Sequence, residues 1–269
     1  MIDRPVDRWV DKRLDARAVL IDIDGVLTVS WEPLSGAVAA VHALREAGLP
    51  FALVTNTTSR TRARIAATLA DAGFPVSPSD VLTAPAAAAA YLREHHPGSR
   101  CLLLNSGDVT EDLDGVHLVT DRPDVVLTGG AGPEFDYSAL NGVFAQLQRG
   151  AQLLAMHANL FWRTSGGLEL DTGAFLLGLQ QAASTEATVL GKPSVRFFAT
   201  ALAHLGVPAE HAVMVGDDVE ADVIGAQRHG LTGVLVRTGK FAPDHEEGIE
   251  GERPHHVIDS IADLPALLT

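Results

Sequence analysis

The sequence predicts an α/β protein in which a doubly wound parallel sheet is interrupted by a second, inserted α/β domain. Short runs of Val, Leu and Ile alternate with segments of helical periodicity, and this alternation is typical of βαβ units. It occurs near both ends of the chain, and a separate series of strands and helices, long enough for a domain, lies between them. We therefore predict a core domain of residues 1–82 and 190–269 and an inserted domain of residues 83–189.

The first part of the core begins with the apolar segment "AVLIDI", which predicts a buried strand. A helix should follow it, capped at its amino end by Ser35 and ended by Gly48. The segment "FALVTN" predicts the next strand, and the spacing of Ile65 and Leu69 predicts a helix that ends at Gly73. Two such strand–helix pairs are expected to be adjacent parts of one parallel sheet.

The insert has its own strands and helix. The segments "CLLLNS", "DVVLTGG" and "AQLLAMHANL" predict strands, and a helical stripe runs from Tyr137 to a stop at Gly150. Connections to the core should lie near "TAPAA" and "EATVLGKP". The core then resumes with a helix over residues 195–205, strands at "HAVMVGDD" and "TGVLVRT", and a helix at "VEADVIGAQRHG" between those strands.

Composition argues against several classes of function. The net charge is −14 and the pI is near 5.1, so bulk electrostatics would not attract the phosphate backbone of nucleic acid. No run of about 18 apolar residues indicates a membrane span, and no apolar secretion signal stands at the amino terminus. The single cysteine, Cys101, is expected to be a small buried side chain. We expect a cytoplasmic protein that binds neither nucleic acid nor membranes.

Polar residues stand where several predicted strands end. In an open parallel sheet, ligands bind beyond the carboxyl ends of the strands, at the point where the strand order reverses. Because both ends of the chain are expected to share one sheet, these residues should converge on one crevice. They are Asp22, Asp24, Thr55, Asn56, Lys192, Asp217 and Asp218.

The converging acids need a compensating cation. Two carboxylates this close repel one another by roughly 1 kcal/mol in water and about 4 kcal/mol near a protein surface. One lysine does not balance the four acids, Asp22, Asp24, Asp217 and Asp218. Only oxygen ligands are available in these segments, and this donor set favours Mg²⁺.

The remaining polar groups suit a phosphate group. Lys192 supplies a positive charge, Thr55 supplies a hydroxyl donor, and backbone N–H groups near Gly25 and Asn56 supply further donors. Taken singly, each has an ordinary structural interpretation: the glycine fits a turn, the threonine a strand and the lysine a helix entry. Their combination in one predicted crevice favours an anion site built around a metal.

Asp218 and Asp222 have two interpretations. They lie four residues apart at the start of a predicted helix and should share one face, where like charges repel weakly. The amino end of a helix favours acids by about 0.3–1 kcal/mol, so an N-cap and a solvated acid explain the pair in part. Either acid could instead orient the metal or its waters. The sequence leaves both interpretations open.

The segments just described resemble a known family. "DIDGVL", "VTNTT", "GKP" and "GDDVEAD", in this order and with a large insert after the second, resemble the four motifs of the haloacid dehalogenase (HAD) superfamily of aspartyl-phosphate phosphatases. The position of the insert resembles the subclass with a large α/β cap. Within it, "LDTGAF", "GKPS" and "VRTGKF" are similar to the branch of phospholysine, phosphohistidine and inorganic pyrophosphate phosphatases. The resemblance covers nearly the whole chain from Ala16 on.

The resemblance implies roles for three acids. Asp22 would be the nucleophile that forms an aspartyl-phosphate. Asp24 would be the general acid and base, a role typically worth roughly 100- to 10,000-fold in rate. Mg²⁺ would be held by Asp22, by the main-chain carbonyl of Asp24 and by Asp217. Animal relatives often carry serine at the position of Asp24, so the acid here favours phosphoester over phosphoamide chemistry.

The resemblance also implies binding roles. Thr55, Asn56 and Lys192 would bind the phosphoryl group of the substrate. The "LDTGAF" segment resembles one that reaches over the active site, so Thr172 and Gly173 either contact substrate or simply begin a helix. A large cap would exclude bulky molecules, and we therefore expect a small phosphorylated metabolite as substrate.

Three alternatives remain beside the phosphoester phosphatase. A phosphatase of the same fold could prefer phosphoamides or pyrophosphate. A signalling receiver domain also uses acids, Thr and Lys around Mg²⁺, although its chain is shorter and "FALVTNTTS" offers no phosphoacceptor aspartate. A binding protein that has lost turnover would keep the same fold. The apolar cap leaves a homodimer open.

Overall fold

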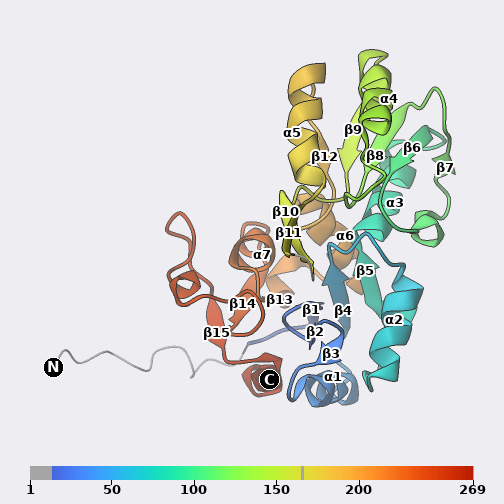
Figure 1. The fold of residues 1–269 in the computed structure, drawn as a ribbon. Helices are drawn as coiled ribbons and strands as arrows, with labels where there is room; N and C mark the ends of the chain where they lie inside the picture. Colours follow the sequence, from blue (N-terminus) through green and yellow to red (C-terminus); the bar gives the residue numbers. More distant parts are fainter. Residues whose placement is uncertain (1–13, 165–166, 269) are drawn as a thin grey trace. The chain divides into compact units, whose positions relative to one another are not determined.

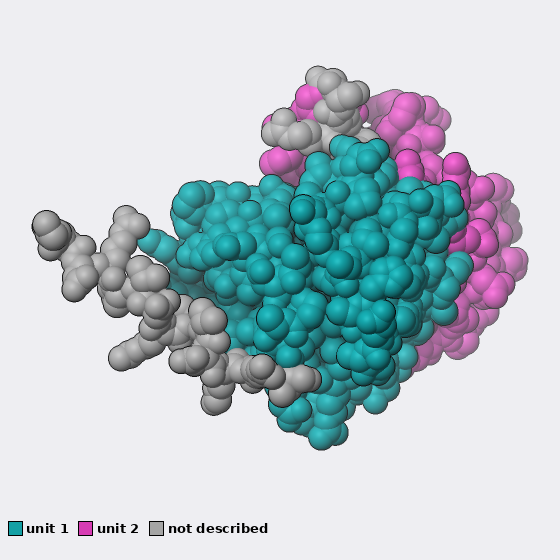
Figure 2. All heavy atoms as spheres, turned by 90° about the horizontal axis from the view of Figure 1, so that it is seen from below, with its two compact units in different colours: residues 1–54, 66–81, 201–269 teal, residues 55–65, 82–200 magenta. Residues whose placement is uncertain are grey.

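The computed structural model of the chain describes residues 14–164 and 167–268. The chain divides into two compact units (Figure 2): unit 1 comprises residues 1–54, 66–81 and 201–269, and unit 2 comprises residues 55–65 and 82–200. Within the described ranges, no helix has the length and apolar character needed to cross a bilayer.

A six-stranded sheet runs through unit 1 (Figure 1), in the order β15-β14-β13-β1-β4-β5. The pairs from β15 through to β4 are parallel. The chain order reverses at β1, because β4 and β5 lie on one side of it and β13 to β15 on the other. The strands are β1 (Ala18–Asp22), β4 (Phe51–Thr55), β5 (Val81–Thr83), β13 (Ala212–Gly216), β14 (Thr232–Val236) and β15 (His256–Ile258). Thr55 of β4 and residues 82–83 of β5 are counted in unit 2. The predicted doubly wound parallel sheet is confirmed.

Short helices and one hairpin complete this part of the chain. The hairpin joins β2 (Thr28–Val29) to β3 (Glu32–Pro33). The α-helices are α1 (Ala37–Glu46), α2 (Arg62–Asp71), α6 (Val195–Leu205), α7 (Gly225–Gln227) and α8 (Leu264–Leu267). Residues 62–65 of α2 and 195–200 of α6 are counted in unit 2. A π-helix spans Val219–Ile224, and 3-10 turns span Pro78–Asp80, Ala209–His211, Pro243–Glu247 and Ile261–Asp263.

The predicted capping of α1 by Ser35 is wrong. The N-cap is Gly36, which has a left-handed φ of 77° and makes no side-chain capping bond. A Cβ at Gly36 would lie only 2.7 Å from the Cβ of Ala262, so close packing requires a glycine here. The Ala37 N–H donates instead to the carbonyl of Leu34, at 3.0 Å. A packing constraint from a distant segment therefore overrides the local capping preference.

Unit 2 contains a five-stranded sheet whose neighbouring strands are all parallel, in the order β12-β9-β8-β6-β7. Its strands are β6 (Arg100–Leu104), β7 (His117–Leu118), β8 (Val125–Thr128), β9 (Gln152–Ala155) and β12 (Thr188–Val189). An antiparallel pair, β10 (Phe161–Thr164) and β11 (Gly167–Leu170), stands apart from it. The helices are α3 (Ala84–His95), α4 (Tyr137–Gln148) and α5 (Thr172–Ala183), with a 3-10 turn at Thr110–Leu113.

Apolar clusters cover both faces of this sheet, as a parallel sheet requires. One cluster packs α3 and the 3-10 turn against the strands, and the other packs α4 and α5, which lie side by side (Figure 1). Cys101 belongs to the first cluster and is fully buried. The prediction of a small buried cysteine is confirmed, and burial raises the pKa of its thiol to about 12.

The predicted insert of residues 83–189 falls inside unit 2, which also includes residues 55–65, 82 and 190–200. The bounds of the units thus differ from the predicted domain bounds. The assignment of residues 83–189 as an inserted domain stays a prediction.

Candidate active site

Three buried carboxylates gather at the carboxyl ends of two neighbouring strands of unit 1. Asp22 is the last residue of β1, Asp217 directly follows β13, and Asp222 lies in the π-helix that comes next. One carboxylate oxygen from each lies within 4.8 Å of the others. Because β1 and β13 are parallel and pair Ile21 with Val215, their ends lie at the same edge of the sheet. This is also where the strand order reverses.

The charge of this acidic cluster must be compensated. The exposed fractions of Asp22, Asp217 and Asp222 are 7%, 1% and 1%, so the carboxylates are largely withdrawn from water. An isolated buried carboxylate is costly, and adjacent like charges add repulsion. The ligands on offer are carboxylate oxygens, which hard divalent cations prefer. The donor set therefore fits Mg²⁺, the ion expected from the sequence.

Glycines make room for two of these carboxylates. Gly25 and Gly239 have φ angles of +84° and +63°, and a Cβ on either would collide with Oδ2 of Asp217. A Cβ on Gly216 would collide with the side chain of Asp222. The backbone thus approaches the acids more closely than any residue with a side chain would permit.

The structure separates the roles of Asp218 and Asp222. Asp218 is the N-cap of the π-helix: its Oδ1 accepts from the N–H groups of Glu220 and Ala221, at 3.2 and 3.0 Å. The N-cap interpretation of Asp218 is thus confirmed. Asp222 is not a solvated acid, because it is buried within the cluster. The Val223 N–H bonds to the Asp218 carbonyl, a π-type step that ordinary helical spacing does not predict.

Asp24 lies in a tight turn two residues beyond Asp22. The N–H groups of Leu27 and Thr28 donate to the carbonyl of Ile23, at 2.9 and 3.1 Å, and the Gly25 N–H donates to the Thr28 carbonyl at 2.7 Å. Asp24 is exposed, in contrast to the buried Asp22. A carboxyl group that water can reach is suited to exchanging protons.

In unit 2, Asn56 binds the backbone of Lys192. The Asn56 Oδ1 accepts from the Lys192 N–H at 2.8 Å, and the Asn56 amide nitrogen donates to the Lys192 carbonyl at 2.9 Å. Thr55, the last residue of β4, accepts from the Thr57 N–H at 3.1 Å through its hydroxyl. Thr55 and Lys192 are 4% and 5% exposed. Asn56 thus fixes Lys192 across 136 positions of sequence.

The predicted site residues therefore form two groups. Asp22 and Asp217 come together with Asp222 in unit 1, and Asn56 and Lys192 come together in unit 2.

The loop after β14, part of the "VRTGKF" segment, was given no role in the site by the sequence analysis. The Lys240 N–H donates to Oδ2 of Asp217 at 2.7 Å, and its Nζ lies 3.0 Å from Oδ2 of Asp218. Loss of solvation opposes the charge on Lys240, but the carboxylates of Asp218 and Asp217 outweigh it and hold the pKa above its usual value. Thr238 donates its hydroxyl to the Gly25 carbonyl at 2.5 Å. The sequence signal that could have indicated this loop is the polar run at residues 237–240, directly after an apolar strand.

The "LDTGAF" segment begins α5 in unit 2. Asp171 is the N-cap and accepts from the Thr172 N–H at 2.7 Å, and the Gly173 N–H donates to the Asn159 carbonyl at 2.9 Å. The helix-start interpretation is confirmed, and contact with substrate stays a prediction. Asp171 also lies 3.9 Å from Nε2 of the buried His157.

His157 predicts a dependence of stability on pH. Burial lowers the pKa of His157, and the charge of Asp171 offsets this only in part. Below about pH 6.5 an unfolded histidine therefore binds more protons than the folded one, and the free energy of unfolding decreases as the pH falls. His255 and His256, whose pKa values burial also lowers, act in the same direction. We expect the melting temperature to fall on acidification and His157→Gln to reduce that fall.

Alkaline pH, where the imidazole is neutral in both states, supplies the reference for this comparison. Equal slopes of melting temperature against pH in the wild type and His157→Gln would contradict the role given to His157.

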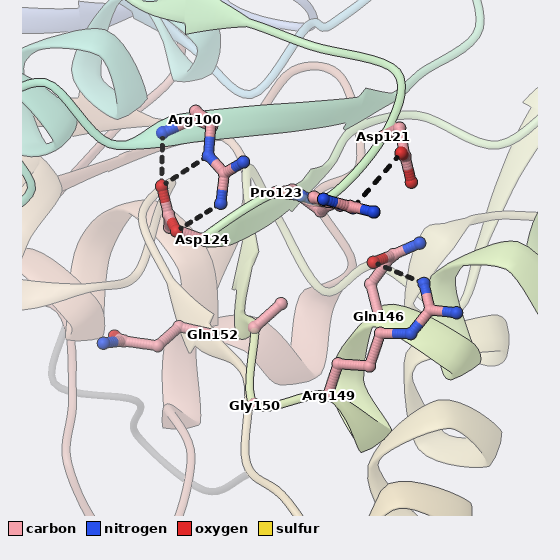
Figure 3. A pocket seen from close by; sticks show the side chains of 10 residues that line it. Arg100, Asp121, Pro123, Asp124, Gln146, Arg149, Gly150 and Gln152 are labelled. Carbon is pink, nitrogen blue, oxygen red and sulfur yellow. Dashed lines mark hydrogen bonds and ion pairs between the residues drawn. The ribbon is translucent and has the colours of Figure 1, made fainter.

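Unit 2 also contains a cavity of about 790 Å³, whose lining includes none of the predicted site residues (Figure 3). It is lined by residues at the amino ends of β6, β8 and β9 and the end of α4, among them Arg100, Asp124 and Arg149. Arg100 and Asp124 face one another as an ion pair at 3.1 Å, and Arg149 turns toward Gln146. Ligands of parallel sheets bind at the opposite, carboxyl ends of the strands. The cavity is therefore not the candidate active site.

Comparisons with known proteins identify the family to which the chain is similar. A family model described as haloacid dehalogenase-like hydrolase matches residues 19–119, and a HAD-hydrolase-like model matches residues 189–264. The human phospholysine phosphohistidine inorganic pyrophosphate phosphatase is 36% identical over 266 residues, which cover 97% of each chain.

Two solved structures are similar over most of the chain. The p-nitrophenyl phosphatase from Archaeoglobus fulgidus has a TM-score of 0.88 and 26% identity, covering 94% of this chain and 100% of that one. A glycerol phosphate phosphatase from Mycobacterium tuberculosis, in complex with magnesium, has a TM-score of 0.83 and 28% identity, covering 94% and 78%.

Proposed function

The chain belongs to the haloacid dehalogenase superfamily and is a phosphatase of that family, and we propose that it hydrolyses a small phosphorylated metabolite through an aspartyl-phosphate on Asp22, with Mg²⁺ as cofactor. The observation that supports this proposal most is the cluster of Asp22, Asp217 and Asp222, in which a strand-end carboxylate stands beside two further acids. Such a cluster places a nucleophile next to a cation site, which phosphoryl transfer requires.

Two acids would perform the chemistry. One oxygen of Asp22 attacks phosphorus, the bond from phosphorus to the leaving oxygen breaks, and the Asp24 carboxyl gives its proton to that oxygen. Water then attacks the phosphorus of the aspartyl-phosphate, Asp24 takes a proton from it, and phosphate leaves as the Asp22 carboxylate re-forms. The turn that holds Asp24 two residues after Asp22 supports this division of labour.

The metal would be held by Asp22, the main-chain carbonyl of Asp24 and Asp217, with Asp222 beside them. The ion would supply neutralisation of the charge on the transferring phosphoryl group. The burial of the three carboxylates supports this assignment, because an unbalanced charge of this size is unfavourable away from water.

Phosphate binding would involve Thr55, Asn56 and Lys192. We assign the Lys192 ammonium and the Thr55 hydroxyl to the phosphoryl oxygens, together with a backbone N–H near Asn56. The two hydrogen bonds from the Asn56 side chain to the Lys192 backbone support a further role, in which Asn56 orients the lysine.

The substrate class can be tested with a panel of phosphorylated metabolites, including pyrophosphate and phosphoamides, assayed for phosphate release with Mg²⁺. Asp24 favours phosphoesters, because an alkyl oxygen needs a proton when it leaves. The similarity to a pyrophosphate and phosphoamide phosphatase favours the second candidate function. Activity above background on phosphoesters alone supports the first, and activity on pyrophosphate or phosphoamides alone supports the second.

The insert of residues 83–189 would act as a cap domain that limits substrate size, and the chain could pair as a homodimer. Failure to hydrolyse bulky phosphorylated substrates would support the cap proposal, and the mass of the protein in solution tests the homodimer.

Asp24→Asn should reduce phosphate release by about 100- to 10,000-fold, the usual contribution of general acid–base catalysis. The loss should be smaller for p-nitrophenyl phosphate than for an alkyl phosphate, because a nitrophenolate leaves without a proton. Asp71→Asn, at another exposed acid of unit 1, serves as the control. Wild-type rates on an alkyl phosphate in Asp24→Asn would remove the assignment.

A further inference from the structure

The loop that follows β14 contacts Asp217 of the acidic cluster and the turn that contains Asp24. Thr238, Gly239 and Lys240 follow the strand after Arg237. Thr238 contacts the Gly25 carbonyl, next to Asp24, and the other two residues contact the carboxylate of Asp217, a proposed metal ligand. We propose that Thr238 and Lys240 are positioning residues that orient the metal ligands Asp217 and the Asp24 carbonyl; this inference rests on the proposed function. The three residues are called the β14 clamp below.

The clamp fixes Asp217 through the main chain. The Lys240 N–H donates to Oδ2 of Asp217 at 2.7 Å, and Gly239 packs against the same carboxylate, where a Cβ would collide with it. A hydrogen bond to a charged acceptor is shorter and stronger than a neutral one. One oxygen of Asp217 is thereby held by the clamp, which does not engage Oδ1.

The clamp also fixes the turn that presents Asp24. The Thr238 hydroxyl donates to the Gly25 carbonyl at 2.5 Å, while the Gly25 N–H donates to the Thr28 carbonyl at 2.7 Å. Both polar groups of Gly25 are thus engaged. Because the Asp24 carbonyl belongs to the same peptide unit as the Gly25 N–H, these two bonds together set the direction of that carbonyl.

The Lys240 side chain extends the clamp to Asp218, which in turn contacts Asp222 of the cluster. Its Nζ lies 3.0 Å from Oδ2 of Asp218, whose other oxygen caps the π-helix through the N–H groups of Glu220 and Ala221. The Asp218 N–H in turn donates to Oδ2 of Asp222 at 3.3 Å. Partners of this kind, which hydrogen-bond to metal ligands, typically change metal affinity or activity by about 10- to 100-fold when removed.

Thr238→Val tests the clamp most sharply, because it removes the hydroxyl and keeps the shape of the side chain. Calorimetric titration of Mg²⁺ into the metal-free variant should give an Mg²⁺ affinity about tenfold or more below that of the wild type. Thr238→Ser restores the donor and should restore the affinity. Thr200→Val is the matched control, since the Thr200 hydroxyl donates to the Arg196 carbonyl at 2.9 Å in an exposed contact within α6. It should bind Mg²⁺ as the wild type does.

A second comparison covers the case in which Thr238→Val does not fold. Lys240→Met and Lys240→Pro both remove the ammonium charge, but only proline also removes the N–H that donates to Oδ2 of Asp217. The proline variant should therefore need more Mg²⁺ for half-maximal binding than the methionine variant. The melting temperature of each metal-free variant shows whether a change in affinity reflects unfolding.

The outcomes separate the clamp from the proposed function. Wild-type Mg²⁺ affinity in folded Thr238→Val, together with equal affinities in folded Lys240→Pro and Lys240→Met, would overturn the clamp while leaving the phosphatase proposal intact. A wild-type protein that takes up no Mg²⁺ would overturn the metal assignment and the clamp together. Reduced affinity in Thr238→Val that serine rescues supports the clamp.

Discussion

Asp22→Asn is expected to abolish phosphate release, with a loss of roughly 10,000-fold or more, comparable to losses of catalytic nucleophiles elsewhere. The amide nitrogen and oxygen of asparagine are poor nucleophiles, so no covalent phosphoryl intermediate forms at an appreciable rate. The substitution also removes one of three buried charges that repel one another. The metal-free variant should therefore melt at or above the wild-type temperature.

This combination of effects distinguishes loss of chemistry from loss of folding. A folded Asp22→Asn variant with wild-type turnover would exclude a covalent mechanism at this residue. A variant that is inactive because it is unfolded would appear instead as a lower melting temperature.

Removal of the metal should be equally severe. Protein stripped with a chelator is expected to show no phosphate release, and added Mg²⁺ should restore it. Asp217→Asn should require far more Mg²⁺ for the same rate, because a carboxylate held at the cluster becomes a neutral amide. Metal binding should also stabilise the folded protein, by about 2.7 kcal/mol when Mg²⁺ exceeds its dissociation constant a hundredfold. A rise in melting temperature with Mg²⁺ measures this directly.

Asp112→Asn provides the control for a buried acid outside the cluster. Asp112 accepts hydrogen bonds from Arg62 and Thr83 within unit 2, at 3.1 and 2.9 Å. Its substitution should lower stability without changing the Mg²⁺ requirement. Full activity in metal-stripped wild-type protein would contradict the metal assignment.

Much of the fold and part of the site could be predicted from the sequence. The strands that end at Asp22 and Gly216 are continuous apolar runs, and in parallel sheets such runs place the residues at their carboxyl ends together. That rule brought Asp22 and Asp217 to one edge, as the structure confirms. The burial of Cys101 could be predicted from the apolar residues beside it in the sequence.

Other features depend on contacts that a local pattern does not contain. Gly36, and not Ser35, caps α1 because Ala262 packs against it from the far end of the chain. Ser30 and Trp31 both adopt positive φ, 52° and 68°, in the hairpin between β2 and β3, although neither residue favours that conformation.

A helical wheel does not predict the burial of Asp222. Regular α-helical spacing places Asp218 and Asp222 on one face, whereas the π-helix gives them different tasks, one as N-cap and one in the cluster. The clamp residues Thr238 and Lys240 were given no role in the site, although "VRTGKF" contains them, because their partners lie 213 and 23 positions away. Their position just after an apolar strand was the signal that the sequence did contain.

The most direct measurement is the mass of the peptide that carries Asp22 after the protein has been mixed with substrate and Mg²⁺ and quenched in acid during turnover. The wild type should yield a fraction of this peptide heavier by one phosphoryl group, and Asp22→Asn should yield none. Turnover without any phosphorylated form of this peptide, or with the phosphoryl group on a different residue, would contradict the claim that Asp22 takes the phosphoryl group.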